Sequence, residues 1–128
     1  MEGLRSVHDD HGATYTELGG REVVADYGRP ERAHRAVRNV VGVTEQPVGV
    51  VTVAGDDRHG FVDNAVSNAV PTADGQGVYS LLLDPQGRIE TDMYVFTTPD
   101  RLLVLTPPGE AHALAAEWTD KTFIQDVD

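Results

Sequence analysis

The 128-residue sequence contains no cysteine, a single lysine and no long apolar run. Without cysteine, disulfides, thiol catalysis and thiolate metal sites are excluded, and nothing indicates an oxidising compartment. No segment approaches the roughly 20 consecutive apolar residues of a membrane helix, and the polar N-terminus lacks the apolar core of a signal peptide. We therefore expect a cytoplasmic protein that is neither secreted nor inserted in a membrane.

Basic residues are also scarce, because 10 of them face 21 acidic residues and the net charge is −11. Such a surface repels nucleic acid, whose binding requires several clustered cations. The nearest cluster is an arginine stripe on a predicted helix, for which a solvated helix face is the preferred interpretation over an anion site. Its members are Arg29, Arg32, Arg35 and Arg38. Strong acidity with almost no lysine is the bias expected of a halophilic protein, since concentrated salt screens charge repulsion.

Hydrophobic periodicity and turn residues predict a mixed α+β fold rather than the regular alternation of a doubly wound sheet. A short strand is possible within 21–28, and the expected helices cover 30–41, a segment after Gly55 and a segment opening at Pro108. The expected strands are 48–55, the two arms of a hairpin within 77–96, 101–106 and a last strand that begins within 121–128. Residues 1–25 form a polar N-terminal arm in this interpretation, and 26–128 form one partial domain. The stop at Asp128, in strand-like sequence, indicates a fragment of a longer chain.

Two polar stretches outside the hairpin have simple structural interpretations. In "AGDDRHGF" (54–61), Asp56 or Asp57 is expected to cap the following helix through its side chain. His8 and His11 lie three residues apart beside two aspartates, but a mobile acidic arm is a better interpretation of them than a metal site. No other group of residues has metal-ligand spacing, so no metal is expected.

The stretch "GVYSLLLDPQGRIETDMYVF" (77–96) predicts two strands joined by a type I turn at 84–87, where proline and glycine take their preferred turn positions. Strand alternation sends Asp92, Tyr94 and Phe96 to the same face as Glu90. An acid beside aromatic rings on one face is either an ordinary solvated carboxylate or an acid set beside a flat ligand. Periodicity alone leaves both interpretations open.

The same stretch resembles a segment of the glycine-cleavage T-protein (aminomethyltransferase) family that reads Tyr-Ser-x-x-x-Asn-x-x-Gly-Gly-Ile-x-Asp-Asp-Leu-x-Val-Tyr. Aligned without a gap, Tyr79 takes the family's tyrosine and Asp92 takes the second aspartate of its Asp-Asp pair. Upstream, "DYG" (26–28), "RAVRNVVGV" (35–43) and "VVTVAGDDRHGFVDNAVSNAV" (50–70) resemble family segments in the right order. The similarity covers about residues 26 to 128.

This resemblance implies an α+β folate-binding domain made of two similar halves, of which the chain matches one: strand, helix, three-strand meander and helix. It implies tetrahydrofolate as the cofactor and a lipoyl carrier protein of the glycine cleavage system as a partner that delivers an aminomethyl group. Asp92 would be the catalytic acid-base or electrostatic residue, close to the reacting nitrogens of the pterin. Tyr79 would line the folate pocket, and Tyr94 is added to the pocket from strand parity.

Departures from the family pattern keep alternatives open. The family's Asp-Val-Ser-His-Met is "EQPVGV" (45–50) here, its Asn-Asp-Val is "NAV" (68–70), and the first aspartate of its Asp-Asp pair is Thr91. "DPQGR" (84–88) is closer to the similar YgfZ-type proteins, which bind folate and support iron–sulfur enzymes without known methyl transfer. Asp92 favours the T-protein family instead, because the YgfZ-type pattern lacks a carboxylate at this position. The alternatives are thus a non-catalytic YgfZ-type protein and a degenerate half-domain that mediates protein contacts.

Overall fold

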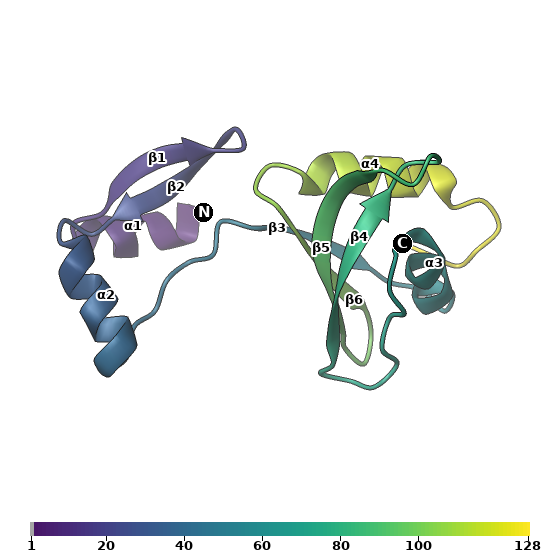
Figure 1. Ribbon diagram of the computed structural model, residues 1–128, viewed down its shortest axis with the longest axis horizontal. Coiled ribbons are helices and arrows are strands. Elements are labelled where there is room, and N and C mark those ends of the chain that lie inside the picture. The colour runs from purple at the N-terminus through teal and green to yellow at the C-terminus, as the bar shows by residue number, and fades with distance from the viewer. Residues whose placement is uncertain (1) are drawn as a thin grey trace. The chain divides into compact units, whose positions relative to one another are not determined.

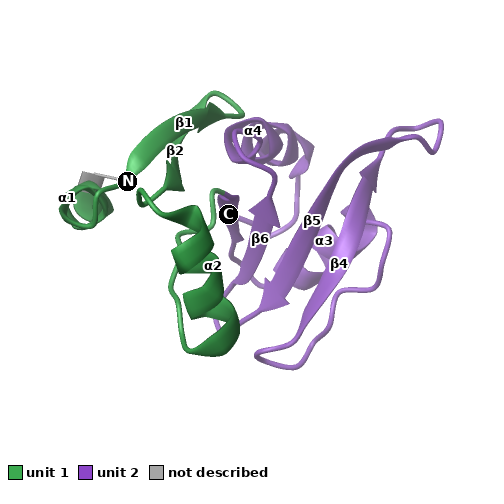
Figure 2. Cartoon of the chain, turned by 60° about the vertical axis from the view of Figure 1, so that its left-hand side comes forward, with its two compact units in different colours: residues 1–47 green, residues 48–128 purple. Residues whose placement is uncertain are grey.

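The computed structural model describes residues 2–128, which fall into two compact units that divide between Pro47 and Val48 (Figure 2). Each unit contains helices and one antiparallel sheet, so the predicted mixed α+β class is confirmed. The division of the sequence at residue 25 into an arm and a partial folate-binding domain stays a prediction.

The first unit contains α1 (Glu2–Asp10), β1 (Thr14–Leu18), β2 (Arg21–Asp26) and α2 (Pro30–Asn39) (Figure 1). β1 and β2 form an antiparallel hairpin. Arg5 of α1 donates to the Glu22 carboxylate, and its guanidinium lies 4.2 Å from the centroid of the Tyr15 ring. Residues expected to be a mobile arm are therefore a helix attached to a hairpin. Periodicity does not reveal this arrangement because its contacts are polar and join residues distant in the sequence.

The helix predicted at 30–41 is present as α2 and begins at Pro30, where a missing N–H costs nothing. None of its residues is buried, and the four arginines of the stripe are all exposed. The interpretation of the stripe as a solvated face agrees with this exposure.

The second unit is a four-stranded sheet with two helices. Its elements are β3 (Gly49–Val53), α3 (Arg58–Ala65), β4 (Gly77–Leu83), β5 (Ile89–Thr97), β6 (Leu102–Thr106) and α4 (Ala111–Lys121). Every pairing is antiparallel, and the strand order is β3-β6-β5-β4.

One face of this sheet carries the core, and α3 and α4 pack on it. The core consists of alternate strand residues, helix residues and one residue of the segment between α3 and β4: Val51, Val53, Val62, Val70, Leu82, Met93, Val95, Leu102, Val104, Leu114 and Trp118. The Trp118 ring packs edge-on against Phe61, with centroids 5.8 Å apart. Because strand side chains alternate, the residues between the buried ones lie on the opposite, outer face of the sheet.

The hairpin predicted at 77–96 is confirmed, together with its turn. The Gly87 N–H donates to the Asp84 carbonyl at 2.9 Å, and Asp84 Oδ1 accepts from the N–H groups of Gln86 and Arg88 at 2.9 and 2.8 Å. The register then shifts, because Leu82 pairs with Thr91 while Leu83 pairs with Ile89. Glu90 is therefore the extra residue of a β-bulge.

The predicted last strand is absent from the described residues. The prediction that an aspartate side chain caps α3 is also wrong. Phe123 and Ile124 are 94 and 88% exposed and lie beside no strand, while Asp128 exchanges both backbone hydrogen bonds with Ala54. Asp57 is the N-cap residue of α3, but its side chain makes no capping bond. Its Oδ2 instead accepts from the Asp126 N–H at 2.8 Å, because the C-terminal segment brings that donor within reach.

No helix among residues 2–128 is long and apolar enough to cross a membrane.

Candidate functional site

The candidate site lies on the outer face of the second unit's sheet, on the hairpin of β4 and β5. Tyr79 pairs directly with Tyr94, and Leu81 pairs with Asp92, so Tyr79 and Asp92 are diagonal neighbours on the same face. The structure thus brings together the three residues that the sequence singled out. The bulge at Glu90 lies before Asp92, and alternation from Asp92 to Phe96 is regular.

A hydrogen bond joins the acid to the first aromatic ring. The Tyr79 hydroxyl donates to Asp92 Oδ2 at 2.6 Å. This bond, and secondarily partial desolvation and the nearby negative charge, raise the pKa of Tyr79 above its ordinary value of 10.0. Asp92 Oδ1 has no hydrogen-bond partner among the described residues and keeps its lone pairs for a donor from outside.

The aromatic rings form a shelf beside Asp92, which we define as Tyr79, Tyr94 and Phe96. The centroids of Tyr79 and Tyr94 are 5.0 Å apart, and Phe96 stacks on Tyr94 with an angle of 16° between planes. The three side chains are 43, 52 and 37% exposed. Together they present flat aromatic surface next to a carboxylate.

Gly77 makes room for the end of the shelf, a role that sequence reasoning missed. It pairs with Phe96, and a Cβ on residue 77 would overlap the phenyl ring. Leu103 and Leu105 of β6 were missed as well. They pair with Phe96 and Tyr94 and extend the outer face with half-buried aliphatic surface. The predicted meander pairs these two strands but leaves their register open, and the register places Leu103 and Leu105 there.

Two further polar residues of β5 lie away from the shelf. Glu90 is exposed at the bulge, and Thr91 donates its hydroxyl to Glu110, the residue before α4. Thr91 therefore has a structural partner where the family pattern has an aspartate. Among the described residues, no group of three or more histidine, aspartate or glutamate side chains is arranged to hold a metal ion.

Comparison of the chain with known protein families shows to which family it belongs. The model of the family described as the GCVT N-terminal domain matches residues 4–128. The chain belongs to the GCVT N-terminal domain family. The match includes most of α1 and the first hairpin, so the part of the chain expected to be an arm is covered by the family model.

Two proteins similar to this GCVT domain are described as aminomethyltransferases. The chain is similar to a probable aminomethyltransferase of Halobacterium salinarum, with 30% identity over 98% of this chain and 36% of that protein. It is also similar to an aminomethyltransferase of Cutibacterium acnes, with 29% identity over 97% of this chain and 34% of that protein. The chain therefore spans just over a third of the length of these relatives.

A solved structure shares the fold of the GCVT domain. It is the glycine cleavage system aminomethyltransferase T from Bartonella henselae, which matches with a TM-score of 0.75 and 19% identity. The superposition covers 98% of this chain and 36% of that one. The likeness extends across both units of the chain.

The hydrogen bond between Tyr79 and Asp92 leads to a test of the site's electrostatics in the GCVT domain. We expect Asp92→Asn to lower the pKa of Tyr79 toward 10.0, because the substitution weakens the hydrogen bond that the Tyr79 hydroxyl donates and also removes the negative charge that disfavours the phenolate. Carbon-detected NMR titration of the tyrosine rings would measure the shift. Tyr15, whose pKa is raised by a bond to Asp9, is the internal control and should not change. An unaltered Tyr79 titration would contradict the bond.

Proposed function

We propose that this chain is the first part of a tetrahydrofolate-dependent aminomethyltransferase of the glycine-cleavage T-protein type. The observation that carries the proposal is the Tyr79–Asp92 pair beside the aromatic shelf, in a chain of the GCVT N-terminal domain family. In this proposal, residues 26–128 contribute part of the folate-binding domain and residues 1–25 precede it. A lipoyl carrier protein would deliver the aminomethyl group.

Asp92 is proposed as the catalytic carboxylate. Its Oδ2 accepts the Tyr79 hydroxyl hydrogen, which fixes the orientation of the carboxylate, and its Oδ1 is left for an N–H of the pterin. Positive charge develops on the reacting nitrogen as the one-carbon unit transfers, and a fixed carboxylate stabilises that charge. Asp92 can therefore act through electrostatics alone or by accepting a proton.

Tyr79 and Tyr94 are proposed as cofactor-binding residues. Both rings are about half exposed on the outer face and offer flat surface to a heteroaromatic ring. Tyr79 has a second task, because its hydroxyl holds Asp92 in place. Phe96 supports the Tyr94 ring by stacking on it.

The relatives favour an enzyme over the non-catalytic YgfZ-type alternative, because those compared are described as aminomethyltransferases. We also propose that the protein works in the cytoplasm and in concentrated salt. The absence of cysteine and the net charge of −11 support this, and one of the compared relatives belongs to Halobacterium salinarum.

Tetrahydrofolate titration of the 128-residue chain tests the proposed site. We expect the NMR ring signals of Tyr79 and Tyr94 to shift with ligand, while those of Tyr15 and Tyr27 stay unchanged. A longer protein that contains the domain should show the same shifts at lower ligand concentration, because further residues would complete the pocket. If neither protein shows shifts confined to Tyr79 and Tyr94, the proposed folate site is wrong.

A further inference from the structure

The arginine stripe of α2 has no acidic partner within the chain. Its four guanidinium groups are exposed, and they make no ion pair and no hydrogen bond with residues 2–128, the part of the chain that the structure describes. A solvated helix face and an unoccupied docking surface are both exposed, so exposure alone does not separate them. The chain's other basic residues supply a comparison.

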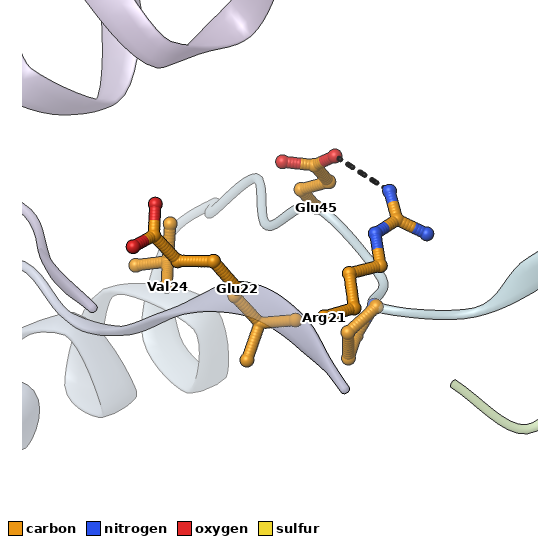
Figure 3. Close-up of a pocket in the computed structure, with 6 residues that line it drawn as sticks. Arg21, Glu22, Val24 and Glu45 are labelled. Carbon is orange, nitrogen blue, oxygen red and sulfur yellow. Dashed lines mark ion pairs between the residues drawn. The ribbon is translucent and has the colours of Figure 1, made fainter. Parts of the chain in front are cut away.

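The two other arginines of the first unit are both paired with acids. Arg5 donates to Glu22, and Figure 3 shows the Glu45 carboxylate turned toward the Arg21 guanidinium, with 4.0 Å between Oε1 and Nη2. Glu45 Oε2 also lies 2.7 Å from Nε2 of His8, which is only 7% exposed. The expectation that His8 belongs to a mobile arm is therefore wrong. Acids of this unit thus pair with basic groups outside the stripe.

The basic residues of the second unit have partners as well. Three of the four lie 2.9 or 3.0 Å from a carboxylate: Arg88, Arg101 and Lys121. The fourth, Arg58, donates to two backbone carbonyls. In a chain with 21 acidic and 10 basic residues, acids are in surplus, so four unpaired arginines on one helix are unexpected. Such a cluster attracts negative charge from outside the chain.

The dimensions of the stripe favour an extended anion over a small one. Four arginines spaced every three residues extend over about 14 Å, at 1.5 Å per residue of helix. The first three line a surface hollow of about 630 Å³ together with Glu31, which lies four residues before Arg35 without forming an ion pair with it. A small anion in the hollow would lie beside the Glu31 carboxylate. An extended partner can place its negative charges along the stripe and avoid Glu31.

Exposed valines at the end of α2 favour a protein over a nucleic acid. Val37, Val40 and Val41 are all more than half exposed, and no residue of α2 is buried. Apolar side chains contribute to the centre of a protein interface, whereas most contacts to a nucleic acid are polar bonds to phosphate and sugar. The net charge of −11 also opposes the dense charge of a nucleic acid backbone.

We propose that α2 is a docking surface for an acidic segment of a partner protein. Carboxylates of the partner pair with the arginine stripe, and an apolar side chain of the partner contacts the valines. The guanidinium group is always charged and binds a carboxylate through two N–H groups, so the preference for an acid requires no titration. Salt screens the ion pairs but leaves the valine contacts. The surface lies in the first unit, so the proposal is independent of the proposed folate site.

A labelled peptide tests the docking surface directly. The probe is a fluorescent 15-residue peptide in which glutamate and leucine repeat at helical spacing, and the control peptide has glutamine in place of glutamate. In fluorescence anisotropy with the 128-residue chain at 150 mM salt, we expect the glutamate peptide to bind at least tenfold more tightly. Absence of binding, or equal affinity for the two peptides, would overturn the proposal. Pyrophosphate or a ten-residue oligonucleotide that binds as tightly as the peptide would also overturn it.

Two triple variants show whether the peptide occupies the stripe. Arg32→Gln, Arg35→Gln and Arg38→Gln together should weaken the glutamate peptide by about 3- to 150-fold, as expected for three exposed ion pairs. The fold should persist, because no residue of α2 is buried. The matched control combines the same change of charge at three paired positions: Arg88→Gln, Arg101→Gln and Lys121→Gln. It should leave the affinity within about twofold of the parent. Equal losses in the two variants would mean that only net charge attracts the peptide, and the docking surface would be refuted.

Discussion

Replacing Gly55 with alanine is expected to destabilise the protein by about 2–5 kcal/mol, the combined cost of backbone strain and of steric overlap. Gly55 lies two residues after the end of β3 and has a φ of 100°, a conformation that residues with a side chain rarely adopt. A Cβ at this position would also overlap the carbonyl group of Asp126. That carbonyl cannot easily move, because it accepts from the Asp57 N–H at 3.0 Å while Asp128 pairs with Ala54.

Urea denaturation in high salt would measure the loss, with Gly60→Ala as the control. Gly60 lies within α3, and nothing lies within 4 Å of a Cβ added there. Alanine in a helix is favoured over glycine by about 0.5–1 kcal/mol, so this variant should be slightly more stable than the parent. Equal stability of the two variants would mean that residues 126–128 do not pack against the end of β3.

The hairpin shows how much of the site the sequence contains. A four-residue turn with proline and glycine predicts the hairpin, and alternation along its second strand places Asp92, Tyr94 and Phe96 on one face. These are local rules, so the amino-acid sequence is sufficient to predict that these three residues share a face. The turn alone does not place Tyr79 diagonal to Asp92, because the bulge at Glu90 shifts the register between the turn and the site.

Contacts between distant segments account for what sequence reasoning did not find. The burial of His8 needs Glu45 and Tyr27, and the position of the C-terminal residues needs the close approach that Gly55 permits. The strand predicted from "KTFIQDVD" failed for a related reason, since β propensity gives no partner strand to pair with. The bulge at Glu90 has no sequence signature that alternation alone could detect.

Asp92→Asn should have the largest effect on function, if the proposed aminomethyltransferase activity is correct. In a longer protein that contains this domain, we expect the substitution to abolish one-carbon transfer or to weaken tetrahydrofolate binding. Loss of a charge-assisted hydrogen bond costs about 1.5–3 kcal/mol, which is about 10- to 150-fold in affinity. Asparagine has nearly the size of aspartate and can still accept from Tyr79, so the fold should be retained.

Glu90→Gln is the control that shows whether the effect of Asp92→Asn comes from the position of the acid or only from the loss of one negative charge. Glu90 lies two residues before Asp92 on the same strand and carries the same charge, but it is exposed at the bulge, whereas Asp92 accepts a hydrogen bond from Tyr79 of the aromatic shelf. Its substitution should leave tetrahydrofolate affinity and turnover within about twofold of the parent, as expected of a surface change. Isothermal titration with tetrahydrofolate and a turnover assay on both variants make the comparison. If the Asp92 variant also binds and turns over like the parent, Asp92 is a solvated strand residue, and the acid that serves the reaction must lie elsewhere in the protein.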